Sequence, residues 1–105
     1  MTPAQLKQRT KAFAVAIVRF ARQLPTDQVT IIMTRQLVRS GTGVGSNYRS
    51  SCRAKSRADF ISKMTTAEEE ADEAQFWLEL LVETGTVRNE RVEPLFDEAD
   101  RKSVV

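Results

Sequence analysis

Apolar side chains recur every three or four residues along most of this chain, a spacing typical of one face of an α-helix. The first series lies within residues 3–24 and consists of Leu6, Thr10, Phe13, Ile17, Phe20 and Leu24. Thr2, Pro3 and Gln5 form a helix-start signal ahead of it, because a threonine N-cap and a glutamine three residues later satisfy each other's backbone N–H groups. Pro25 ends the series. The pattern predicts a first helix over about residues 3–24.

The second segment admits two interpretations. Residues 29–34 are rich in β-branched side chains and precede three alternating glycines, an order that superficially resembles a strand feeding a phosphate-binding loop. However, the glycine spacing does not fit the dinucleotide-binding fingerprint, and no Gly-Lys-Ser/Thr follows it. A helical series also runs straight through the glycines: Met33, Leu37, Gly41, Val44, Tyr48 and Cys52. We therefore predict one long helix over about residues 27–54.

The glycines Gly41, Gly43 and Gly45 weaken this second helix, by on the order of 1 kcal/mol each relative to alanine. Close approach of a neighbouring helix would compensate for that loss. Local fraying of the helix is the alternative.

Two further helices are predicted in the second half of the chain. Ser56 and Asp59 form a helix-start signal, and a heptad seam follows: Phe60, Met64, Ala67, Ala71, Ala74, Leu78 and Leu81. Gly85 is placed as a C-terminal cap, and a fourth apolar face follows: Val92, Leu95, Phe96 and Ala99. With helices at about 3–24, 27–54, 57–84 and 89–104 and short connections, the chain is expected to form one all-α domain over residues 1–105. The expected fold is an antiparallel, up-down-up-down, left-handed four-helix bundle.

Charge is distributed very unevenly along the 105 residues. Residues 1–63 contain twelve Lys and Arg against two acids, and residues 64–105 contain four Lys and Arg against twelve acids, so that +10 and −8 give the net +2. Either the basic helices pack beside the acidic ones, within or between subunits, or the basic half binds phosphate.

The residue inventory excludes several kinds of chemistry. The chain has no histidine, which removes Ser-His-Asp catalysis, histidine-based zinc sites and the Glu-x-x-His sites of di-metal bundles. The acids between Glu68 and Glu73 are interpreted as a solvated or arginine-paired face, with a divalent-metal site as the minor alternative. We therefore expect no enzyme activity, no cofactor, no metal and no small-molecule substrate.

The single cysteine and the absence of a long apolar run indicate the cellular compartment of the protein. Cys52 lies on the apolar series of the second helix and is interpreted as a small buried side chain. One cysteine forms no internal disulfide, and the chain has neither a secretory leader nor a run of about 18 apolar residues. We expect a cytoplasmic protein without membrane contact.

Arginines line the polar side of the second predicted helix. At 100° per residue, Arg35 and Arg53 project in the same direction, and Arg39 and Arg49 lie about 40° to either side. Arg57 extends this row past the turn. The planar guanidinium group can bind the oxygens of either a phosphate or a carboxylate in a bidentate way. The row is therefore a candidate contact for RNA or DNA, or for carboxylates of the same chain or a neighbouring subunit.

Several short motifs resemble those of a bacterial four-helix-bundle protein family whose founding members are encoded by intervening sequences in 23S ribosomal RNA genes. The matching segments are residues 39–40, 45–48, 53–61, 69–73, 77–78 and 93–95. The resemblance covers nearly the whole chain and is strongest over residues 36–85. Ser50 stands where family members usually carry a glutamate.

The resemblance implies a ring-like homopentamer without an established enzymatic activity. A distant similarity to the accessory variability protein of diversity-generating retroelements implies RNA or DNA binding. We therefore expect a non-enzymatic, oligomeric scaffold or interaction protein that binds copies of itself, with off-seam apolar side chains Ile61, Trp77 and Leu80 at the subunit contacts. The alternative is a nucleic-acid-binding accessory factor that uses Arg35, Arg39, Arg49, Arg53 and Arg57.

Overall fold

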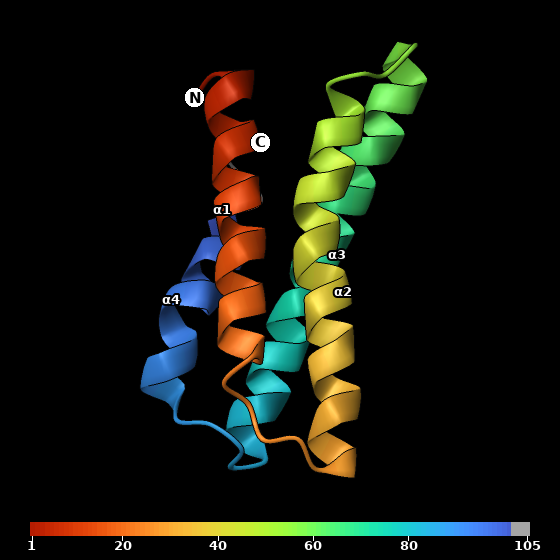
Figure 1. The fold of residues 1–105 in the computed structure, drawn as a ribbon. Coiled ribbons are helices and arrows are strands. Elements are labelled where there is room, and N and C mark those ends of the chain that lie inside the picture. Colours follow the sequence, from red (N-terminus) through yellow and green to blue (C-terminus); the bar gives the residue numbers. More distant parts are fainter. Residues whose placement is uncertain (102–105) are drawn as a thin grey trace.

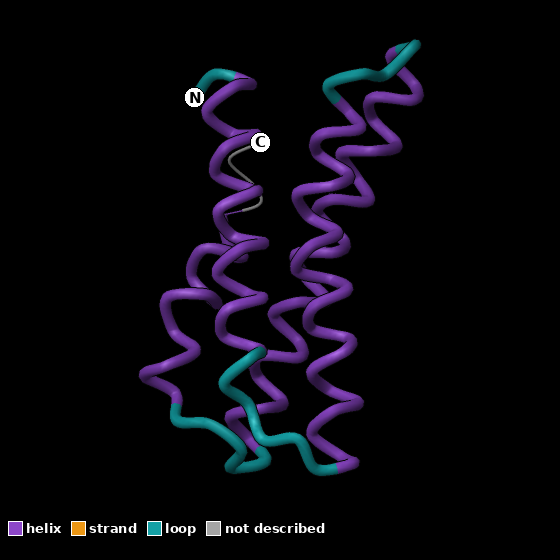
Figure 2. Tube along the Cα trace, viewed as in Figure 1, coloured by secondary structure: helices purple, strands orange, loops and turns teal. Residues whose placement is uncertain are grey.

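Four antiparallel helices make up the structure, a computed structural model that describes residues 1–101. The helices are α1 (Pro3–Ala21), α2 (Gln28–Ser51), α3 (Arg57–Glu83) and α4 (Asn89–Asp100), and residues 1–101 contain no strand. The chain reverses direction at each of the three connections (Figure 1), and the connections are short loops (Figure 2). The predicted all-α four-helix bundle is confirmed. Its left-handed twist stays a prediction.

Each helix packs against two neighbours. The contacts join α1 to α2, α2 to α3, α3 to α4 and α4 to α1, and the α2–α3 contact is the most extensive. The α1–α2 side of the bundle is therefore opposite the α3–α4 side. Because α4 is the shortest helix, it accompanies only part of α1, and the α2–α3 connection extends beyond the N-terminal end of α1 (Figure 1).

The helix ends follow local capping chemistry. Thr2 and Gln5 form the predicted capping box, in which the Gln5 N–H donates to Thr2 Oγ1 at 3.1 Å and the Thr2 N–H donates to Gln5 Oε1 at 2.9 Å. Asp27 caps α2 by accepting a hydrogen bond from the Thr30 N–H at 3.1 Å, and the side chain and then the backbone of Thr30 lower the pKa of Asp27. Gly85 follows α3 with φ +74°, the left-handed conformation expected of a C-terminal cap.

Three helices end before their predicted last residue. The first ends at Ala21 instead of Leu24, since the residue before a proline is disfavoured in the α conformation and the chain closes in a tighter turn. The second ends at Ser51 instead of Ala54, and the third ends at Glu83, with Thr84 as its C-cap. The fourth helix was predicted to reach residue 104. Arg101 is the C-cap of α4, and residues 102–104 lie outside the described residues.

The core combines the predicted apolar faces. Ile17, Leu37, Leu78 and Leu81 are fully buried, and α4 adds Val92 and Ala99. Phe60, the first position of the predicted α3 seam, is instead 44% exposed. It lies in the first turn of α3, where the α2–α3 hairpin extends past the end of α1 and finds no third helix to pack on (Figure 1).

The glycines of α2 allow close helix packing. A Cβ added at Gly41 would lie 2.8 Å from Ile17 Cγ2 of α1, and one added at Gly45 would lie 3.1 Å from the Thr10 carbonyl oxygen. On the other side of α2, a Cβ at Gly43 would lie 3.0 Å from the Glu70 carboxyl group of α3. The helix continues unbroken through all three positions, so the close-approach interpretation is confirmed over fraying, and the strand interpretation of residues 29–34 is excluded.

Candidate functional site

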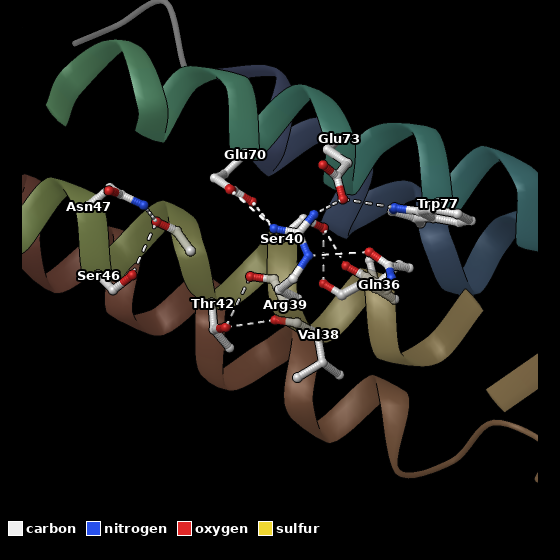
Figure 3. Close-up of polar contacts among 12 residues, drawn as sticks. Gln36, Val38, Arg39, Ser40, Thr42, Ser46, Asn47, Glu70, Glu73 and Trp77 are labelled. Carbon is white, nitrogen blue, oxygen red and sulfur yellow. Dashed lines mark hydrogen bonds and ion pairs between the residues drawn. The ribbon is translucent and has the colours of Figure 1, made fainter. Parts of the chain in front are cut away.

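Arg39 is held between α2 and α3 by carboxylates of its own chain. Its guanidinium group contacts Glu70 at 3.3 Å and Glu73, and its Nε donates to Gln36 Oε1 at 3.2 Å (Figure 3). Trp77 Nε1 donates to Glu73 Oε2 at 3.2 Å. The hydrogen bond from Arg39 is the main cause that lowers the pKa of Glu73, and the same pairing raises the pKa of Arg39.

The other four arginines of the predicted row have no such partner. Arg35, Arg49, Arg53 and Arg57 are exposed, and within residues 1–101 none of their side chains makes a hydrogen bond or an ion pair. Because α2 ends at Ser51, only the first two project from that helix. Arg53 lies in the turn that follows, and Arg57 is the first residue of α3. The continuous helical row is therefore interrupted at its C-terminal end.

A basic groove runs along the surface where α1 and α2 meet, near the N-terminal end of α1. Its lining includes Lys7, Lys11 and Ala14 of α1 and Gly45, Ser46 and Arg49 of α2. An adjoining hollow shares the same three cations, and neither lining contains an acid. The sequence analysis named Arg49 as part of the arginine row on the second helix, but it predicted neither this groove nor the two lysines. The available signal was the complete absence of acids from residues 1–26, with lysines four residues apart on one helix face.

An acidic groove lies between α3 and α4. Its lining includes Glu79, Val82 and Glu83 of α3 and Val92, Glu93 and Phe96 of α4. The lining contains no lysine or arginine. Within the described part of the chain, Glu79 and Glu83 make no ion pair, and Glu93 only accepts a 3.5 Å hydrogen bond from the Asn89 side chain. The sequence analysis did not predict this groove, and it assigned no role to the acids that line it.

The three apolar side chains predicted at subunit contacts have different surroundings. Ile61 is 51% exposed, whereas Trp77 and Leu80 are half-buried and pack against the core. Phe76, which was not among the predicted contacts, is 53% exposed and stacks edge-on against Trp77 with ring centroids 5.0 Å apart. On α3, the freely exposed apolar groups are therefore Phe60, Ile61 and Phe76.

Cys52 is exposed, contrary to its predicted burial. The helical series that placed it inside the core assumed that the second helix continues to Ala54. Cys52 is the C-cap that follows Ser51, and it lines a surface hollow beside Pro3 and Ala4, at the N-terminal end of α1, where no further turn of that helix covers it. Nearby, Ser51 is buried and donates to the Tyr48 carbonyl oxygen at 2.6 Å.

The acidic run of α3 offers no metal site in the structure that is described. Glu70 and Glu73 face Arg39, and no group of three or more acidic or cysteine side chains within residues 1–101 is arranged to hold a metal ion. The arginine-paired interpretation of the run is therefore confirmed for these two glutamates. No helix among residues 1–101 has the length and apolar character needed to cross a bilayer.

A small apolar cavity of about 50 Å³ lies where α4 ends. Leu6, Phe13, Val44, Tyr48 and Met64 are among its lining residues. Arg9 and Glu98 close one side, with Arg9 Nε 2.5 Å from Glu98 Oε2. Thr10, Glu68 and Arg101 also line this cavity, and its volume of about 50 Å³ is well below the ~300–1,000 Å³ of ordinary ligand pockets.

Comparisons with known proteins agree with the fold. The model of the family described as 23S rRNA-intervening sequence protein matches residues 3–104. A solved structure from Bacteroides thetaiotaomicron, described as a protein with unknown function from the S23 ribosomal protein family, is 38% identical in sequence with a TM-score of 0.86. The match covers 93% of this chain and 91% of that one. A search of curated proteins gave no match. On the family match over nearly its whole length, the chain belongs to the 23S rRNA-intervening sequence protein family.

Proposed function

We propose that this protein is a non-enzymatic scaffold or interaction protein that acts in the cytoplasm as a homo-oligomer, with five subunits as the expected number. The observation that carries the proposal is the exposure of large apolar side chains on α2 and α3. Val29 and Ile32 are 67% and 61% exposed, and Phe60, Ile61 and Phe76 are each more than two-fifths exposed. A small domain gains stability when such groups are covered by a second copy.

Absolute mass in solution tests this proposal. Light scattering after size exclusion, at low and at high salt, should give a mass near five times 11.9 kDa. Replacement of Ile61 and Phe76 by serine removes exposed apolar area without opening the core, so the mass should fall. Thr65→Ser, an exposed change on the same helix, is the matched control and should keep the wild-type mass. A wild-type monomer at both salt concentrations would refute the proposal.

A second candidate function is nucleic-acid binding, favoured by the unpaired arginines. Among residues 1–101, no carboxylate pairs with Arg35, Arg49, Arg53 or Arg57, and Lys7 and Lys11 lie beside Arg49 in the basic groove. Contacts of this kind neutralise phosphates, and they carry little sequence preference and depend strongly on salt.

Retention of generic RNA and DNA at two salt concentrations tests the second candidate. Replacement of Arg35, Arg49 and Arg53 by serine should weaken binding. It should also reduce the slope of log affinity against log salt by about one for each phosphate that is no longer neutralised. Arg39→Ser is the matched control, because Glu70 and Glu73 already occupy that guanidinium group. Absent binding at low salt, or an unchanged slope in the triple variant, would exclude this function.

A further inference from the structure

The two charged grooves lie on opposite sides of the bundle. The basic groove separates α1 from α2, and the acidic groove separates α3 from α4. Since the helices pack in the cyclic order α1, α2, α3, α4, these two sides face away from each other. No rearrangement of side chains within one protomer brings Lys7, Lys11 or Arg49 to Glu79 or Glu83.

Each groove combines unpaired charge of one sign with small or apolar contact surface. Ala14 and Gly45 line the basic groove, and Val82, Val92 and Phe96 line the acidic groove. Outside the grooves, Val15 is 41% exposed on α1 and Phe76 is 53% exposed on α3. Protein–protein contacts combine such groups: apolar area provides affinity, and complementary charge selects the face and the register.

We propose that the basic groove of one copy binds the acidic groove of the next copy, an inference that rests on the proposed self-association and names its interface. The contact is heterologous, because two basic grooves, or two acidic grooves, would repel each other. A heterologous contact produces a ring when the rotation between subunits closes and a filament when it does not.

A second copy fits these grooves better than a nucleic acid does. Phosphates would neutralise Lys7, Lys11 and Arg49 but would be repelled by Glu79, Glu83 and Glu93. A nucleic acid therefore leaves the acidic groove unsatisfied. A copy of this chain supplies both signs of charge at once, which agrees with a net charge of only +2 despite halves of +10 and −8.

Charge reversal and mixing test the interface. One variant reverses the three basic groove positions, with Lys7, Lys11 and Arg49 each replaced by Glu. The other reverses the three acidic groove positions, with Glu79, Glu83 and Glu93 each replaced by Lys. Each variant carries two grooves of the same sign, so each alone should fall to the monomer mass. An equimolar mixture restores complementary pairs and should raise the mass above that of the monomer. The two variants must alternate, so a closed ring of five keeps one like-charge contact and recovery is expected to be partial.

The control reverses charges away from both grooves. Lys55, Arg57 and Arg88, which flank the loops, are each replaced by Glu, and this variant changes the net charge by as much as the basic-groove variant. It should retain the wild-type mass. Circular dichroism establishes that each variant is folded. Where a triple variant loses its helical signal, Lys11→Glu and Glu83→Lys are mixed instead, with a smaller decrease and recovery of mass expected.

The possible results separate the interface from the proposed function. A fall in mass in both groove variants with recovery on mixing supports the interface. A wild-type oligomer whose groove variants keep their mass overturns the interface and leaves self-association standing. A wild-type protein that is monomeric at every salt concentration overturns both, and if that monomer binds RNA through Lys7, Lys11 and Arg49, the basic groove is a nucleic-acid site.

Discussion

At the scale of single residues, Gly41 and Gly43 show how one residue type serves two different contacts. A methyl group at Gly41 would point at Ile17, which is fully buried and has branched carbons at 2.8 and 2.9 Å. A methyl group at Gly43 would meet the flexible end of Glu70 instead. The sequence places the two glycines two residues apart, on different sides of α2, and thereby separates the contact with α1 from the contact with α3.

Alanine substitution should distinguish these contacts. Gly41→Ala should lower the free energy of unfolding by about 1–3 kcal/mol, since Ile17 has no space into which it can move. Gly43→Ala should be neutral or stabilising, because the Glu70 side chain can shift and alanine gains about 1 kcal/mol of helix propensity over glycine. Urea unfolding measures both changes, and each variant is the control for the other. Equal destabilisation of the two variants would contradict this account of the packing.

At the scale of elements, the Arg39 cluster connects α2 to α3 at the most extensive helix contact in the bundle (Figure 3). Helical geometry predicted the direction in which Arg39 projects from α2. It left open whether the guanidinium group meets phosphate or carboxylate, because that depends on where α3 lies. The packing of α3 places Glu70 and Glu73 within reach, and in the structure Arg39 meets these carboxylates.

The same cluster should make stability depend on acid pH. The pKa of Glu73 is lowered below its ordinary value of 4.5 in the folded protein. The unfolded chain therefore binds more protons in this range, and the stabilisation is lost as the pH falls from about 4.5 through the folded pKa. Glu73→Gln should remove part of this acid dependence, so that wild type and variant differ most near neutral pH and converge in acid.

Urea unfolding at a series of pH values measures this effect. Glu69→Gln is the control, because Glu69 is exposed on the same helix, lies outside both grooves and makes no ion pair in the structure described. Its pH dependence should follow that of the wild type. A constant difference between wild type and Glu73→Gln at all pH values would show that the Arg39–Glu73 pair does not contribute through its charge.

At the scale of the whole molecule, the uneven charge becomes a division between two sides of the bundle. Arg9–Glu98 and the Arg39 cluster pair some charges across helices. In the described part of the chain, the cations of the basic groove and the acids Glu79 and Glu83 make no ion pair and lie on opposite sides. Assembly and nucleic-acid binding are competing explanations of that division, and both stay proposals.

The number of helices was predictable because it depends on local information. Helical periodicity, the capping residues Thr2 and Asp27 and the left-handed Gly85 act within a few residues of chain, and the structure confirms them. The end of α2 was less predictable. The apolar spacing continues to Cys52, but that residue is the exposed C-cap, and spacing alone does not show where a neighbouring helix stops covering the end of α2.

The sequence by itself determined four amphipathic helices, their caps and a separation of charge, since periodicity and composition need no knowledge of neighbours. The tertiary structure alone decided which charges meet. Arg39 is paired because α3 passes beside it, and Lys7 and Lys11 join Arg49 because Gly41 and Gly45 let α1 approach α2 closely. Trp77 and Leu80 pack on the core while Phe76 remains exposed, because exposure depends on the angle at which helices cross. Spacing along one helix contains no information about that angle.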